Sequence, residues 1–150
     1  MNRRRAVALV LTALLPVAGA SRAEGTSKGI PITVYKSPTC GCCAGWASYL
    51  STRGFAVTTI DQEDLSALKA KHGITPELRS CHTALVGGYV VEGHVPSADI
   101  HRLLEERPAI VGLTAPGMPM MSPGMASIEP RDYDVLQFDR EGRVAVFSRY

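Results

Sequence analysis

The chain has 150 residues, with 16 lysine and arginine residues against 14 acidic residues and a formal net charge of +2. Its hydrophobic content of 45% and charged content of 20% are typical of a globular protein and exclude a disordered chain or a coiled coil. The length allows one domain of ordinary size with a core of its own.

The first 23 residues have the pattern of a signal peptide. Three arginines at positions 3–5 precede a short apolar stretch over residues 6–20, and small residues follow it. The stretch is too short and too rich in alanine and glycine to be a membrane span, and no later apolar run is long enough for one. We therefore expect export to the periplasm without stable membrane insertion after cleavage.

Cleavage also changes the charge of the chain. Loss of residues 1–23 removes four of the 16 basic residues and no acidic residue, which leaves 12 against 14 and a net charge of −2. Nucleic acids and anionic membranes both need a basic protein surface, so neither is expected as the main partner.

The rest of the chain begins with a flexible lead-in over residues 24–31 and continues with alternating strands and helices. In chain order we expect a strand over 32–35, a helix with its apolar stripe at Cys43, Trp46, Ala47 and Leu50, a strand over 55–60, a helix that Asp64 caps and Gly73 ends, a hairpin of strands 83–86 and 89–92, and a helix from Ser97 to Pro108. This order, β-α-β-α-β-β-α, indicates an α/β layer structure and resembles the thioredoxin fold.

The character of the sequence changes after this core. Residues 109–134 have no sustained period and contain four of the five methionines, so we expect a long methionine-rich loop. Two strands over 135–138 and 143–147 then predict a terminal β-hairpin. We expect residues 109–150 to extend the core, so that residues 32–150 form a single domain.

Three of the four cysteines lie in the sequence Cys40-Gly41-Cys42-Cys43, at the first turn of the first predicted helix. Unpaired N–H groups and the helix dipole stabilise thiolates at such a position. Thiolate is both the nucleophile of disulfide exchange and a ligand for soft metals, so the spacing suits either chemistry. Purely structural disulfides remain an alternative, although they would cross-link little chain here.

The fourth cysteine, Cys81, comes directly before the predicted hairpin. The first hairpin strand should run antiparallel to the first strand of the sheet, which brings Cys81 to the edge where the other cysteines lie. The four sulfurs should therefore converge. The second hairpin strand returns to the same edge with His94, which is therefore a candidate metal ligand, with a structural hydrogen bond as the alternative. Strand alternation predicts that His82 points away from Cys81.

The methionine-rich loop contains two similar turns, Pro116-Gly117-Met118 and Pro123-Gly124-Met125. Thioether sulfur is a soft, neutral ligand that favours Cu(I) and does not form disulfides. We therefore favour Met118 and Met125 as further ligands, and adaptable loop packing is the alternative.

Three segments resemble the motifs of one known family: residues 35–43 (Tyr-Lys-Ser-Pro-Thr-Cys-Gly-Cys-Cys), residues 80–84 (Ser-Cys-His-Thr-Ala) and residues 92–96 (Glu-Gly-His-Val-Pro). Together with the Pro-Gly-Met turns, they resemble the CopG-type exported metal-binding proteins, domain-of-unknown-function family 411. The resemblance implies a thioredoxin-like fold, a periplasmic location and a role in copper resistance. It also implies that Cys40, Cys42, Cys43 and Cys81 bind Cu(I) as a small multi-copper thiolate cluster.

These motifs favour two functions of different classes for the protein. The first is a periplasmic copper-binding protein, whose partners are the metal ion and other periplasmic copper-handling proteins. The second is an enzyme, a thiol-disulfide or copper oxidoreductase that uses Cys40 and Cys43. A zinc site is a weaker alternative, because adjacent Cys42 and Cys43 fit poorly into tetrahedral zinc spacing and zinc gives the methionines no role.

Overall fold

The structure is a computed structural model that describes residues 29–150. The predicted signal peptide and most of the predicted lead-in lie outside the described residues. Within them the strands are β1 (Ile30–Lys36), β2 (Phe55–Asp61), β3 (Thr83–Val86), β4 (Tyr89–Gly93), β5 (Gly112–Ala115), β6 (Asp134–Phe138) and β7 (Val144–Arg149). The helices are α1 (Gly41–Ser51), α2 (Ser66–Lys71) and α3 (Ser97–Glu106), with a short 3-10 helix, η1 (Pro76–Leu78).

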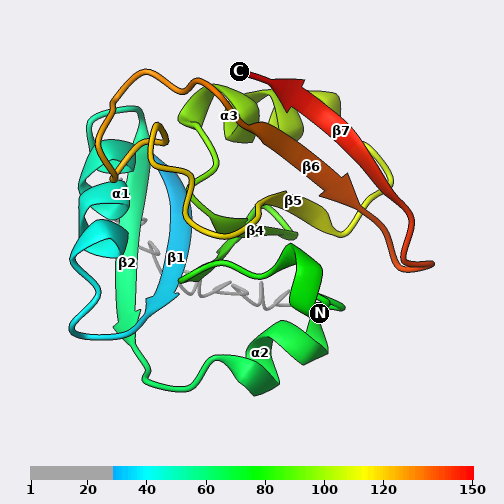
Figure 1. Ribbon diagram of the computed structural model, residues 1–150, viewed down its shortest axis with the longest axis horizontal. Coiled ribbons are helices and arrows are strands. Elements are labelled where there is room, and N and C mark those ends of the chain that lie inside the picture. Colours follow the sequence, from blue (N-terminus) through cyan, green and yellow to red (C-terminus); the bar gives the residue numbers. More distant parts are fainter. Residues whose placement is uncertain (1–28) are drawn as a thin grey trace, which may run out of the picture.

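All seven described strands belong to one mixed sheet with the order β2-β1-β3-β4-β5-β6-β7 (Figure 1). β1 is parallel to β2 and antiparallel to β3, and β3 and β4 form the hairpin across Gly87-Gly88. The predicted order of strand, helix, strand, helix, hairpin and helix is confirmed. The protein has a mixed α/β fold.

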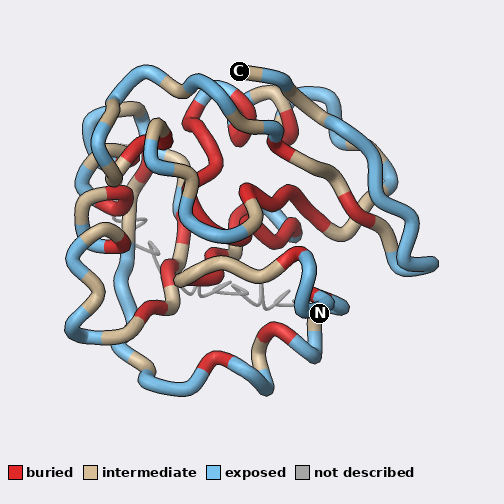
Figure 2. Tube along the Cα trace, viewed as in Figure 1, coloured by how far each residue is buried: buried red, intermediate tan, exposed pale blue. Residues whose placement is uncertain are grey.

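α1 and α3 cover one face of the sheet. Trp46 and Leu50 of α1 and Ile100 and Leu103 of α3 are fully buried in one apolar cluster with inward side chains of the central strands. The Trp46 indole N–H donates to the Val95 carbonyl at 2.9 Å. This hydrogen bond connects α1 to the segment between β4 and α3. Figure 2 shows the buried chain concentrated in the central strands and the inner sides of these helices.

The opposite face carries a smaller apolar cluster. Ile74 and Leu78, after α2 and in η1, pack there with Val90 and Phe138. α2 begins one residue later than a cap at Asp64 would place it, at Ser66, although the Asp64 carboxylate still accepts the Ser66 N–H at 2.8 Å. The neighbours Val90 and Val91 belong to different clusters because successive side chains of a strand point to opposite faces.

The prediction of an unbroken loop over residues 109–134 is wrong at one point. β5 lies within this range, parallel to β4, and all four of its residues are buried. A strand buried on both faces has no polar–apolar alternation, so the periodicity of four residues could not reveal it. The connection that contains the methionines therefore spans residues 116–133.

β5 also connects the predicted terminal hairpin to the rest of the sheet. β6 pairs antiparallel with β5, and β7 pairs antiparallel with β6. The 116–133 segment leaves β5, reaches α1 and returns to β6 (Figure 1). None of the helices within residues 29–150 is long and apolar enough to cross a membrane.

Candidate metal centre

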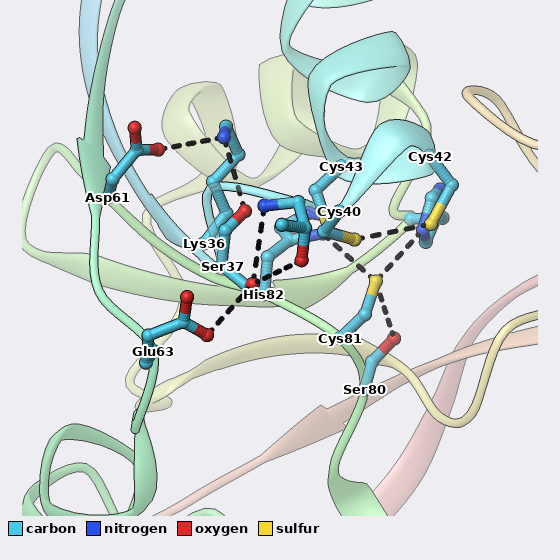
Figure 3. The surroundings of a disulfide bond; sticks show 12 residues. Lys36, Ser37, Cys40, Cys42, Cys43, Asp61, Glu63, Ser80, Cys81 and His82 are labelled. Atoms are coloured by element: carbon cyan, nitrogen blue, oxygen red, sulfur yellow. Dashed lines mark hydrogen bonds and ion pairs between the residues drawn. A yellow bond between two sulfur atoms is a disulfide. The ribbon is translucent and has the colours of Figure 1, made fainter.

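The four cysteines meet where β1 ends and β3 begins. Cys40 is the N-cap residue of α1, and Cys42 and Cys43 occupy its first turn. The β1–β3 register pairs Tyr35 with Thr83, which places Cys81 opposite this turn. The four Sγ atoms all lie within 4.8 Å of one another, so the predicted convergence of the four sulfurs is confirmed (Figure 3).

The cysteines are not equivalent in this structure. Cys40 and Cys43 form a disulfide, and Cys42 and Cys81 are free thiols. The Cys42 sulfur lies 3.5 Å from that of Cys40. A four-thiolate ligand set therefore requires two-electron reduction of the disulfide, while the free thiols lie close enough for exchange with it.

Two buried histidines add nitrogen donors on the Cys81 side. The Nε2 atom of His94 lies 3.1 Å from the Cys81 sulfur, and the Nδ1 atom of His82 lies 3.3 Å from it. Both histidine residues are fully buried, and Cys81, His82 and His94 form a second group of closely spaced donors. His94 reaches the site as predicted.

The expectation that His82 points away from Cys81 is wrong. β3 begins only at Thr83, so strand alternation does not apply to the pair. The His82 ring lies 4.4 Å from the Trp46 ring between their centroids. Its Nε2 atom is buried without a hydrogen-bond partner, a position that suits neutral imidazole.

Burial sets the protonation of these groups. It raises the pKa of the Cys81 thiol to about 11, with a further contribution from the nearby Cys42 sulfur. Burial also lowers the pKa of His94, and it lowers the pKa of His82 well below the ordinary histidine value, with the neighbouring His94 adding to the effect. Metal-free protein at neutral pH therefore has a protonated Cys81 thiol beside two neutral imidazoles.

The two Pro-Gly-Met turns lie beside the cysteine-bearing segments. The Gly117 N–H donates to the Arg79 carbonyl, and the Ser80 hydroxyl donates to the Gly117 carbonyl, next to Cys81. Gly124 packs so closely on α1 that a Cβ there would lie 2.8 Å from the Cys42 carbonyl oxygen. The first turn therefore contacts the chain next to Cys81, and the second contacts the first turn of α1, which carries Cys42.

The predicted methionine ligands occupy different surroundings. Met118 follows the first turn and is 55% exposed, and Met120 is 63% exposed. Met125 is partly buried and lines a groove on the outer side of α1 with Gly45 and Tyr49. Exposure at this level argues against a packing role for Met118.

The sequence did not predict a buried ion pair that supports Cys81. The Glu92 carboxylate of β4 pairs with Lys69 of α2, and the Glu92 side chain is completely buried. Glu92 also accepts the Ser80 N–H at 2.7 Å. A glutamate within an otherwise apolar strand was the available signal, but its partner lies 23 residues away along the chain.

A mixed α/β sheet with four cysteine sulfurs gathered at a helix start defines a candidate soft-metal-binding protein. Two solved structures, titled "Copper resistance protein copG", forms 1 and 2, are each 41% identical to this chain with a TM-score of 0.75, over 81% of this chain and 98% of theirs. The chain therefore belongs to the CopG-type copper-resistance family. The family model described as "Protein of unknown function, DUF411" matches residues 78–125. No curated protein sequence matches the chain.

Proposed function

We propose that this protein is a periplasmic copper-binding protein of copper resistance, which holds Cu(I) through the thiolates of Cys40, Cys42, Cys43 and Cys81. The observation that carries the proposal is the grouping of four sulfur atoms within 4.8 Å of one another. Thiolate is a soft ligand and selects Cu(I) over the hard cations. Membership of the copper-resistance family supports the choice of copper.

The protein is exported, and its exported part has one domain. Residues 1–23 act as the signal peptide, and residues 32–150 form a single thioredoxin-like domain with a C-terminal extension over 109–150. The sheet order β2-β1-β3-β4 and the position of the cysteines at the first strand–helix junction support the thioredoxin-like assignment. Copper-handling proteins of the same compartment deliver or accept the metal.

The other predicted ligands have separate roles in this proposal. His94 presents its Nε2 atom next to the Cys81 sulfur, where it can bind the metal. Met118 and Met125 supply thioethers from turns that dock beside Cys81 and Cys42, and they complete the site or shield it from solvent. Thioether ligands stay unprotonated in acid, which suits a copper site outside the cytoplasm.

The test is anaerobic competition for Cu(I) between reduced residues 24–150 and a chromophoric chelator. We expect Cys42→Ser to weaken Cu(I) binding at least tenfold. Ala44→Ser is the matched control, because it adds a hydroxyl to an exposed position of the same helix and removes no thiol. Equal affinity of Cys42→Ser and wild type would contradict thiolate capture.

Two further measurements distinguish the donors and the metal. X-ray absorption of the copper form should report Cu(I) with sulfur as the main ligand, and a nitrogen- and oxygen-only shell would contradict the proposal. Met118→Leu and Met125→Leu should each weaken binding more than Met120→Leu. Cu(I) should raise the unfolding temperature of reduced protein more than zinc does, and the reverse order would favour a structural zinc site.

A second candidate function is a thiol-disulfide or copper oxidoreductase. The Cys40–Cys43 disulfide, with the Cys42 sulfur 3.5 Å from Cys40, favours it. Two thiolates that close this disulfide release two electrons, which reduce two Cu(II) ions to Cu(I). The test is anaerobic addition of Cu(II) to reduced protein. Two Cu(I) formed per disulfide formed supports it, whereas binding of Cu(II) without disulfide formation excludes it.

A further inference from the structure

The Lys69–Glu92 ion pair holds the chain on both sides of Cys81 and His82. Glu92 accepts the Ser80 N–H at 2.7 Å and the Thr83 hydroxyl at 2.7 Å. The Lys69 ammonium donates to the Ser80 carbonyl at 3.2 Å and to the Thr83 hydroxyl oxygen at 3.0 Å, besides its direct contact with Glu92. Both backbone polar groups of Ser80 are therefore bound to one ion pair.

The pair is more than a contributor to general stability. Removing two charges from water costs about as much as their attraction returns, so a buried ion pair by itself is weak evidence for stabilisation. Here the same charges satisfy polar groups of Ser80 and Thr83, the residues that flank Cys81 and His82. Charged partners make these hydrogen bonds shorter and stronger than neutral ones.

Cys81 and His82 lie outside the strands, before the first residue of β3. Besides the ion pair, the main chain of this segment is held by the Gly93 N–H, which donates to the His82 carbonyl at 3.0 Å, and by the bridge between Ser80 and Gly117. The contact between the Cys81 sulfur and the Cys40–Cys43 turn depends on the course of the backbone into β3. Cys42 and Cys81 are 39 positions apart in the chain, so no local geometry keeps their sulfurs together. A small change of that backbone would separate the two sets of thiols.

We propose that the Lys69–Glu92 pair is the positioning device that holds the Cys81 thiol against the Cys40–Cys43 turn. Lys69 and Glu92 act through the chain at Ser80 and Thr83 and do not bind metal themselves. The copper arm of the test rests on the proposed function, whereas the disulfide arm does not require copper.

The disulfide arm measures the proximity of two thiols directly. In a Cys40→Ser/Cys43→Ser background, only Cys42 and Cys81 remain, and a glutathione redox buffer gives the equilibrium constant for their disulfide. We expect Lys69→Met/Glu92→Leu, which removes both charges together, to lower this constant at least tenfold. Asp99→Asn is the control, because Asp99 is also buried and hydrogen-bonded, to Ser148 and Tyr150. It should lower the unfolding midpoint and leave the disulfide equilibrium within twofold.

The copper arm uses a double-mutant cycle with Cys81→Ser. Loss of the ion pair should weaken Cu(I) binding in the otherwise wild-type protein and have no further effect once Cys81 is absent. Failure of the wild-type protein to bind Cu(I) would contradict the proposed function. The disulfide equilibrium constant would still test the positioning role, because its measurement needs no copper.

A milder variant keeps the test decisive if the double substitution unfolds the protein. Thr83→Val removes two hydrogen bonds to the pair without leaving a charge alone, and it should lower the disulfide equilibrium constant about threefold. An unchanged constant, in folded Lys69→Met/Glu92→Leu or, failing that, in Thr83→Val, would overturn the proposal.

Discussion

The Nε2 atom of His94 lies 3.1 Å from the Sγ of Cys81, while its Nδ1 atom lies 2.7 Å from the carbonyl oxygen of Pro123. A carbonyl oxygen only accepts hydrogen bonds, so Nδ1 carries the proton and Nε2 presents its lone pair to the thiol. One imidazole therefore connects the cysteine group with the 116–133 segment.

The first prediction concerns this tautomer. We expect His94 in the metal-free protein to be a neutral Nδ1–H imidazole at pH 7, because burial lowers its pKa and Pro123 accepts the Nδ1 proton. Two-bond nitrogen–proton NMR correlations of the histidine rings distinguish the two tautomers. An Nε2–H tautomer of His94 would contradict the assigned contact with Cys81.

The second prediction concerns thiol reactivity. Burial raises the pKa of Cys81 to about 11, and thiolate is the form that alkylating reagents attack. Alkylation of Cys81 at pH 8 should be at least tenfold slower than that of an unfolded control in urea. The rate should rise about tenfold per pH unit toward pH 11, because each unit increases the thiolate fraction tenfold.

Peptide mapping by mass spectrometry separates the reaction of Cys81 from that of Cys42. Rapid Cys81 alkylation at pH 8 in folded protein, with no change between pH 8 and pH 10, is the result that would refute a raised pKa.

The third prediction concerns stability in mild acid. Burial lowers the pKa of His82 well below the ordinary value, so the folded protein keeps this ring neutral while the unfolded chain takes up a proton near pH 6.5. The contribution of neutral His82 is therefore fully present above pH 6.5 and is lost as pH falls below it. The free energy of unfolding should fall by about 1.4 kcal/mol per pH unit for this one proton.

Urea unfolding at pH 5.0–7.5 measures this slope. His82→Phe keeps an aromatic ring beside Trp46 and removes the titrating group, so its slope should be smaller by one proton. A slope that stays the same in His82→Phe would assign the acid sensitivity to other groups.

The fourth prediction concerns the docking of the 116–133 segment on α1. Gly124 has φ +87°, and a Cβ at this position would lie 2.6 Å from the Trp46 backbone nitrogen. Gly142 has a similar φ of +78° but nothing within 4 Å of its Cβ position. Gly124→Ala should therefore be more destabilising than Gly142→Ala, by about 1–3 kcal/mol, because both are strained and only the first overpacks.

Urea unfolding of the two alanine variants gives this difference. Equal destabilisation would mean that the close approach of Gly124 to α1 is absent in solution.

The local pattern was sufficient for much of the fold. Apolar spacing predicted α1 and α3, because their side chains alternate between core and solvent with the helical period. The Gly87-Gly88 turn predicted the hairpin, whose second strand, β4, is buried throughout. It did not predict β5, whose four residues are all buried and show no alternation. The meeting of Cys81 with Cys40, Cys42 and Cys43 was also predictable, because antiparallel pairing of β1 and β3 places the start of one strand beside the end of the other.

The order of the elements and the edge of the sheet at which the sulfurs gather could be inferred from the sequence, because both depend on short-range periodicity and on the direction of neighbouring strands. The orientation of the His82 ring and the ion pair beside Cys81 became visible only in the folded chain. The His82 ring points toward Cys81, and the Lys69–Glu92 pair forms hydrogen bonds with Ser80 and Thr83. These contacts join residues that are adjacent or far apart in the chain without any regular spacing. They follow from the course of the backbone before β3 and from the burial of charge, which no local pattern encodes.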